Sequence, residues 1–123
     1  MTLVKDLLDA TIHDAPDVAR IAALLEAVQD AERASTSCAA AMLAAGHGMG
    51  EAIAADLALA DVCQAASRVL SRQGATDDVV GPLLAATAAA ARRSYAQCSQ
   101  HAHHHAHCRL CSDASKQVFD LIG

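Results

Sequence analysis

Apolar and polar residues alternate along most of the chain with the period of amphipathic helices. Apolar or small residues return at alternating intervals of four and three, which places them on one helix face. Breakers divide this pattern into four segments, at about 16–45, 50–72, 80–102 and 104–121, and residues 3–10 allow a further short helix. Because the connections are short, successive helices should be antiparallel neighbours. The pattern predicts an all-α fold, an antiparallel up-down-up-down four-helix bundle that forms a single domain over residues 1–123.

The segment boundaries follow residues that start or stop helices. The stretch 14–17 (Asp-Ala-Pro-Asp) combines a cap candidate, a proline in the first turn and an acid at the positive end of the helix dipole. The glycine-rich stretch 46–50 ends the first helix, and a loop at 73–78 separates the second helix from the third, with Thr76 as a cap candidate. Pro82 complicates this third start, because proline is tolerated in a first turn and not in a helix interior.

The predicted inward faces carry every cysteine of the chain. They are Leu24, Val28, Ala31, Ser35, Cys38 and Met42 in the first helix, Ala52, Asp56, Leu59, Cys63, Ala66 and Leu70 in the second, Leu84, Thr87, Ala91, Ser94, Cys98 and His101 in the third, and Cys108, Cys111, Ser115, Val118 and Ile122 in the fourth. Cysteine often serves as a small buried hydrophobe, which would explain one or two of them. Five of five on these faces favours a role as ligands.

Composition and charge narrow the class of protein. Of the 123 residues 31 are alanine, while Tyr95 and Phe119 are the only aromatic ones, so close-packed helices are favoured over a β-sandwich or a disordered chain. The net charge is −5 with scattered basic residues, which argues against nucleic acid. No apolar run approaches a membrane span or a signal peptide, so we expect a cytoplasmic protein whose odd number of cysteines stays reduced.

A candidate metal site is expected at one end of the bundle. Residue rise along the helices brings four thiols and one carboxylate to this end, while Cys63 lies deeper. The adjoining stretch 101–108 holds five of the seven histidines. The predicted metal ligands are Cys38, Cys63, Cys98, Cys108, Cys111, His101, His105, His107 and Asp56. Thiolates supplemented by imidazole suit Cu(I) best and Zn(II) next, and an iron–sulfur cluster would need four thiolates around one point.

Two motifs resemble the bacterial four-helix-bundle copper storage proteins. They are residues 56–73 (DLALADVCQAASRVLSRQ) and residues 101–111 (HAHHHAHCRLC). The resemblance implies a bundle whose inward cysteines hold Cu(I), in proteins that are commonly tetramers. This chain departs from that pattern, because most positions where thiols would be expected carry Ala, Ser, Thr, Leu or Val. What the resemblance implies is therefore the fold and a small site at the histidine-rich end, not a bulk store.

Three functional hypotheses remain at this point. The first is a low-capacity Cu(I)-binding bundle that acts as a buffer, chaperone or sensor-like partner. The second is a Zn(II) or iron–sulfur site in the same place. The third is a metal-free structural paralogue, a homo-oligomer (tetramer or dimer) packed through alanine-rich faces such as 39–41 and 88–91. We do not expect an enzyme, because no nucleophile–base pair or phosphate loop is present, and Asp56 is either a ligand or a buried acid hydrogen-bonded to Ser94 or a thiol.

Overall fold

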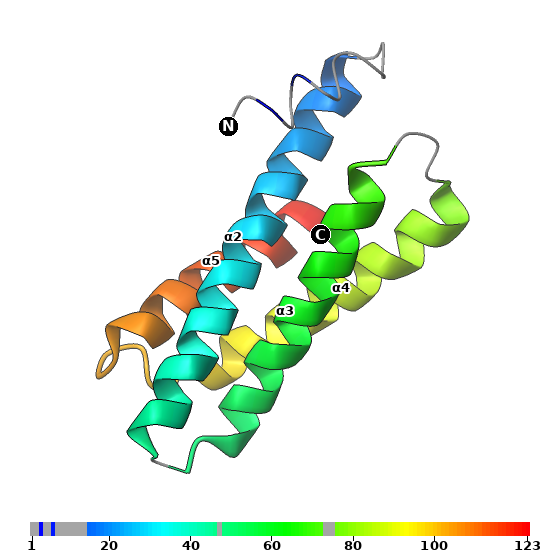
Figure 1. Cartoon of the computed structure of the whole chain (residues 1–123). Helices are drawn as coiled ribbons and strands as arrows, with labels where there is room; N and C mark the ends of the chain where they lie inside the picture. The colour runs from blue at the N-terminus through cyan, green and yellow to red at the C-terminus, as the bar shows by residue number, and fades with distance from the viewer. Residues whose placement is uncertain (1–2, 4–5, 7–14, 47, 73–75) are drawn as a thin grey trace.

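Four helices make up most of the chain (Figure 1). The computed structural model describes all residues except 1–2, 4–5, 7–14, 47 and 73–75. The helices are α2 (Ala15–Ala45), α3 (Gly50–Leu70), α4 (Asp77–Cys98) and α5 (Ala106–Ile122), and the described residues contain no strand. This confirms the predicted all-α fold. The short helix allowed at 3–10 falls outside the described residues except at two positions.

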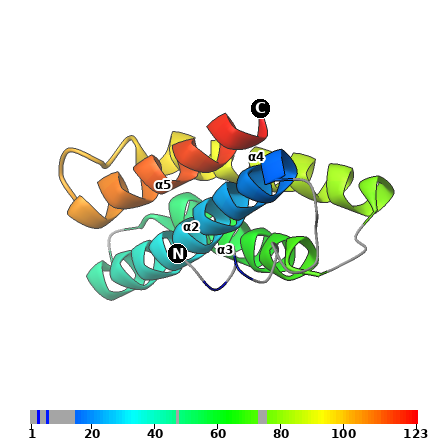
Figure 2. The same cartoon turned by 90° about the horizontal axis from the view of Figure 1, so that it is seen from above.

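The helices form an antiparallel bundle in which each helix has two neighbours. α2 and α4 each pack against both α3 and α5. The α2–α3 turn and the α4–α5 connection lie at the same end of the bundle, as Figures 1 and 2 show from two directions. Gly46 and Gly48 both have φ of 66° in the α2–α3 turn, a left-handed conformation that glycine adopts without strain. The predicted four-helix bundle is confirmed.

The start of α4 differs from the sequence prediction. The helix begins at Asp77, ahead of the predicted residue 80, because the Thr76 carbonyl accepts the N–H of Val80 at 2.9 Å. Asp77 and Asp78 then stand in the first turn, where the helix dipole favours negative charge. Pro82 is consequently inside the helix, where its missing N–H leaves one turn without its backbone hydrogen bond. Thr76 occupies the cap position as predicted, although its side chain makes no capping bond.

The predicted ends of two helices were also too late. α3 ends at Leu70, and α4 ends at Cys98 instead of residue 102. Beyond Cys98 the N–H of His101 bonds to the Cys98 carbonyl, and that of His104 to the His101 carbonyl, both at 3.0 Å. These bonds span three residues and tighten the chain out of the α-helix in a stretch where histidine has low helix propensity. His105 is extended, with φ −132° and ψ 117°, so α5 begins two residues later than the predicted 104.

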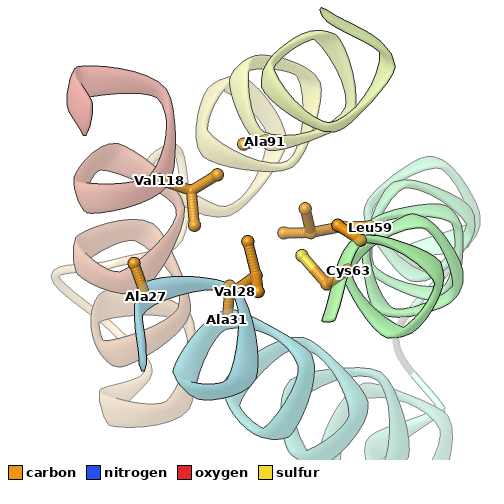
Figure 3. Packing of buried hydrophobic residues seen from close by; sticks show 8 residues of the cluster. Ala27, Val28, Ala31, Leu59, Cys63, Ala91 and Val118 are labelled. Carbon is orange, nitrogen blue, oxygen red and sulfur yellow. The ribbon is translucent and has the colours of Figure 1, made fainter. Parts of the chain in front are cut away.

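The predicted inward residues line the interior. All of them are buried except Leu84, His101 and Ile122, which are half-buried. In the middle of the bundle side chains from all four helices meet, including those of Val28, Leu59, Cys63, Ala91 and Val118 (Figure 3). Because alanines fill many of the remaining positions, the helix backbones can approach closely. This central layer is apolar apart from one thiol.

The two ends of the bundle have different interiors. The end far from the α4–α5 connection is filled by large aliphatic residues, Val18, Leu24, Leu25 and Leu70. The other end contains Cys38, Met42, Ala52, Cys98, Cys108 and Cys111, with Met49 packed beside them. The predicted gathering of thiols at one end is confirmed, and the other end is aliphatic. Ala39, Ala88 and Ala91 belong to the core, so the alanine-rich runs are only partly outer faces.

In the described part of the chain, no helix is both long and apolar enough to span a bilayer.

Candidate metal centre

Among the described residues, two overlapping groups of side chains place potential metal ligands close together. The first, here called the inner group, consists of Cys38, Asp56, Cys98 and Cys111, and the second, the outer group, of Cys38, Cys108 and His107. Within each group the ligand atoms lie within 4.8 Å of one another. The inner group takes one side chain from each of the four helices, and Cys38 belongs to both groups.

Asp56 is the hydrogen-bond acceptor at the centre of the inner group. Its Oδ1 accepts hydrogen bonds from the Ser94 hydroxyl at 2.7 Å, from the Cys98 thiol at 3.2 Å and from the Cys111 thiol at 3.3 Å. Ser115 in turn donates to the Ser94 hydroxyl at 3.4 Å. All five side chains are fully buried. The sequence predicted that Asp56 is either a metal ligand or a buried acid hydrogen-bonded to Ser94 or a thiol. The structure shows these hydrogen bonds.

Two buried polar atoms of these groups have no hydrogen-bond partner. They are Oδ2 of Asp56 and Nε2 of His107, and Ser112 Oγ, next to Cys111, is the third such side-chain atom among the described residues. A buried polar atom without a partner costs about 1–3 kcal/mol, so native structures rarely leave one unexplained. A carboxylate oxygen and an imidazole nitrogen beside thiols are both metal-ligating atoms. Their lack of a protein partner is the arrangement expected of ligands that receive a metal ion.

Burial and mutual contact perturb the acidity of the inner group. Burial raises the pKa of Asp56 to about 6, and the charge on Cys111 acts in the same direction. The pKa of Cys38 is raised by its contacts with Cys111 and Cys98 and by burial, and the pKa of Cys98 is raised chiefly by its contact with Cys111. The same contacts lower the pKa of Cys111. These buried groups therefore share protons that a bound cation would displace.

The outer group lies at the start of α5, next to the histidine-rich connection. The Sγ atoms of Cys38 and Cys108 are 3.8 Å apart. Three ligands around one thiolate-bound ion stand about 4 Å apart if each metal–sulfur bond is about 2.3 Å. Burial raises the pKa of Cys108, so this thiol too must lose a proton when it binds a metal. His107 is half-buried, and its ring centroid is 5.3 Å from that of His105.

Three predicted ligands lie outside both groups. Cys63 is buried in the central apolar layer, where burial raises its pKa to about 12. It stands seven residues beyond Asp56 on α3, which corresponds to about 10 Å along the helix axis. His101 and His105 are half-buried in the α4–α5 connection, near the groups but not within their ligand spacing. As ligands, all three stay predictions.

The donor set restricts the chemistry of the site. The inner group provides three thiols and a carboxylate, and the fourth thiol of this end belongs to the outer group. Met42 and Met49 pack against the thiols, and their soft thioethers add to the preference for a soft ion.

Comparison with known proteins identifies the family. Residues 17–120 match the copper storage protein family. The chain belongs to this family. The resemblance drawn from residues 56–73 and 101–111 is thereby confirmed, and copper storage proteins are a metal-storage family, not a catalytic one. Among curated proteins, no sequence matches the chain.

Solved structures of a copper storage protein have the same fold. Ccsp from Streptomyces lividans, loaded with 10 copper equivalents, is 31% identical with a TM-score of 0.90, over 97% of this chain and 94% of that one. The cytosolic copper storage protein of the same organism with five coppers is also 31% identical, with a TM-score of 0.80, over 85% and 89% of the two chains. A histidine-to-alanine variant of Ccsp gives 30% identity, a TM-score of 0.81 and the same coverage.

Proposed function

We propose that this member of the copper storage family is a low-capacity Cu(I)-binding protein that holds two ions at one end of its bundle. The observation that carries the proposal is the gathering of four of the five thiols into two ligand groups that share Cys38. Cu(I) is the biological ion that soft thiolates select most strongly. A buffer or a transfer protein needs only a few ions, whereas a bulk store needs thiols along the whole interior.

The rest of the interior supports the low capacity. From the inner group toward the middle of the bundle, the inward-facing positions carry serines and then aliphatic residues. They are Ser35, Ser94 and Ser115, followed by Leu59 and Val118, and all five are fully buried. Hydroxyl groups are poor ligands for Cu(I), and aliphatic side chains are none. The Ccsp structure with 10 copper equivalents shows that the same fold can accommodate many more ions. We infer that the capacity of this chain is set by its side chains and not by its fold.

A competition titration tests the stoichiometry. Reduced protein is titrated with Cu(I) in the presence of a chromophoric Cu(I) chelator, and we expect two ions per chain held against the chelator. Fewer than one ion per chain would refute copper binding. It is the result expected if the protein has a metal-free structural role. A value approaching the loading of Ccsp would refute the low capacity.

Single substitutions assign the two ions. Cys98→Ser removes a ligand of the inner group alone and Cys108→Ser one of the outer group alone, so each should lose one ion. Cys38→Ser should weaken both, because both groups contain this thiol. Cys63→Ser tests the predicted thiol ligand outside both groups, and a stoichiometry equal to that of the unchanged protein would confine copper to the two groups.

Location and assembly form a second part of the proposal. We infer a cytoplasmic location, where thiols stay reduced, as in the cytosolic Streptomyces protein. We also infer a homo-oligomer, a tetramer or a dimer, because Leu43, Leu57 and Leu110 are large apolar side chains exposed on three different helices. Cell fractionation tests the first inference. Size-exclusion chromatography with light scattering tests the second, and a clean monomer would refute it.

A further inference from the structure

Three thiols of the inner group surround one point from three different helices. They are Cys38 of α2, Cys98 of α4 and Cys111 of α5, and all three are fully buried. Their Sγ atoms lie within 4.8 Å of one another. This arrangement provides a set of three sulfur donors for an atom that forms three bonds.

Each of these thiols is a hydrogen-bond donor in the structure. Cys38 donates to Sγ of Cys108 at 3.8 Å, and Cys98 and Cys111 donate to Oδ1 of Asp56 at 3.2 and 3.3 Å. Contact with Cys111 and burial raise the pKa values of Cys38 and Cys98, so these two thiols hold their protons most strongly. A ligand that consumes thiol protons as it binds suits this group.

A fully buried group also favours a ligand that introduces no charge. Three thiolates around one Cu(I) have a formal charge of −2, and uncompensated charge in a protein interior is costly. A neutral hydroxide of a trivalent element avoids this cost. Each S–H gives up its proton for a bond to that element, and each hydroxyl group leaves as water.

Arsenous acid, As(OH)3, has this chemistry and is uncharged at neutral pH. It condenses with three thiols to give As(SR)3 and three water molecules. Three As–S bonds form, three As–O bonds break and each thiol proton leaves in water, so neither arsenic nor sulfur changes oxidation state. As–S bonds are nearly as long as thiolate–zinc bonds, about 2.3 Å, which places the sulfur atoms about 3.5 Å apart. The widest Sγ pair therefore needs to close by about 1.3 Å at most.

The outer group does not have this capacity. It contains only two thiols, Cys38 and Cys108, and its third donor is the imidazole of His107. It therefore cannot supply three As–S bonds. Trivalent arsenic distinguishes the two groups, whereas Cu(I) has suitable soft donors in both.

We propose that the inner group has a second binding activity, in which it captures one molecule of arsenous acid as a tris-thiolate of Cys38, Cys98 and Cys111. Copper and arsenic compete for these three thiols, so the copper-loaded chain should not take up arsenic.

Arsenite added to the reduced, metal-free protein provides the test. After gel filtration, native mass spectrometry should show one adduct per chain, with the added mass of one arsenic atom less three hydrogen atoms. X-ray absorption at the arsenic edge should show three sulfur neighbours and no oxygen. Absence of an adduct, or an adduct that keeps an oxygen neighbour, would overturn the proposal.

Single substitutions locate the arsenic. Cys98→Ser should lose the three-sulfur adduct, because two thiols remain at the site. Cys108→Ser is the matched control, since this thiol is also buried and contacts Cys38 but lies outside the set of three, and it should keep the adduct. An adduct that persists in Cys98→Ser, or that is lost in Cys108→Ser, would contradict the assigned ligands. Far-ultraviolet circular dichroism of each variant shows that it retains the helical bundle.

The arsenic and copper proposals fail separately. A chain that binds two Cu(I) ions but forms no three-sulfur adduct overturns the arsenic proposal alone. A chain that forms the adduct but holds no Cu(I) against the chelator overturns the copper proposal alone. Loading with two Cu(I) ions beforehand should block the adduct. Arsenic taken up while both ions stay bound would lie elsewhere, which would overturn its assignment to the inner group.

Discussion

The buried acid Asp56 should make the metal-free protein less stable at neutral pH than its own neutral variant. The pKa of Asp56 is raised from the usual value of about 3.9 to about 6 by burial. The folded state therefore binds this proton more tightly than the unfolded chain does. The stabilising effect of the proton is complete below about pH 4 and is lost as pH rises through about 6.

The magnitude follows from the two pKa values. At about 1.4 kcal/mol per pH unit, the gap between about 3.9 and about 6 amounts to about 3 kcal/mol by pH 7. Asp56→Asn removes the charge and keeps a carbonyl oxygen that can accept from Ser94. We expect its free energy of unfolding to exceed that of the unchanged protein by about 2–3 kcal/mol at pH 7 and to be nearly equal to it at pH 4.

Urea denaturation between pH 4 and pH 8 measures the effect, with reductant and chelator present so that no metal binds. Asp61→Asn is the matched control, because Asp61 lies on the same helix and is exposed. Its stability should follow that of the unchanged protein at every pH. If the Asp56→Asn and unchanged proteins give parallel stability curves, the pKa of the buried carboxylate is not raised in the folded state.

The remaining predictions concern the core and the capacity of the site. Cys63→Ser should cost about 1–3 kcal/mol in urea denaturation, because it buries a hydroxyl in an apolar layer, whereas Cys63→Ala should cost less. Ser94→Cys combined with Ser115→Cys should raise the Cu(I) stoichiometry above two in the chelator titration, since the two hydroxyls are 3.4 Å apart and adjoin the inner group; an unchanged stoichiometry would contradict this. Apparent Cu(I) affinity should rise between pH 6 and pH 8, because the raised pKa values of Cys38 and Cys108 mean that binding releases protons, and a pH-independent titration would argue against these ligands.

The sequence predicted the interior well because helical periodicity is a local property. The four-and-three spacing placed Val28, Asp56 and Cys111 on inward faces, and the structure buries all of them. Helix ends were less predictable, since they depend on local competition. Thr76 did indicate a start of α4 at Asp77, but Pro82 argued for a later start, and the structure extends the helix ahead of the proline through backbone bonds to the Thr76 carbonyl.

The site was predictable only in part, because ligand distances depend on how the helices are aligned along the bundle axis. Residue rise brought Cys38, Asp56 and Cys111 to one level, which the inner group shows. It could not separate two groups or show that Cys38 belongs to both. The sequence also could not show that Oδ1 of Asp56 accepts from Ser94 while Oδ2 has no partner. This difference depends on the side-chain rotamer of Asp56 and on the position of the neighbouring helix.

The division of the interior has a physical consequence for how such a bundle limits its metal content. Serine is nearly the size of cysteine, so Ser35, Ser94 and Ser115 keep the helices as close as thiols would, and the thiol end retains the spacing that metal binding needs. Leucine and valine at the other end are larger and hold that end together by apolar burial alone, at about 25 cal/mol per Å². Ser35 donates to the carbonyl of Ala31 on its own helix at 2.6 Å, so this position is satisfied without metal. The part of the interior away from the two ligand groups is therefore filled by hydroxyl-bearing and aliphatic side chains that need no metal partner.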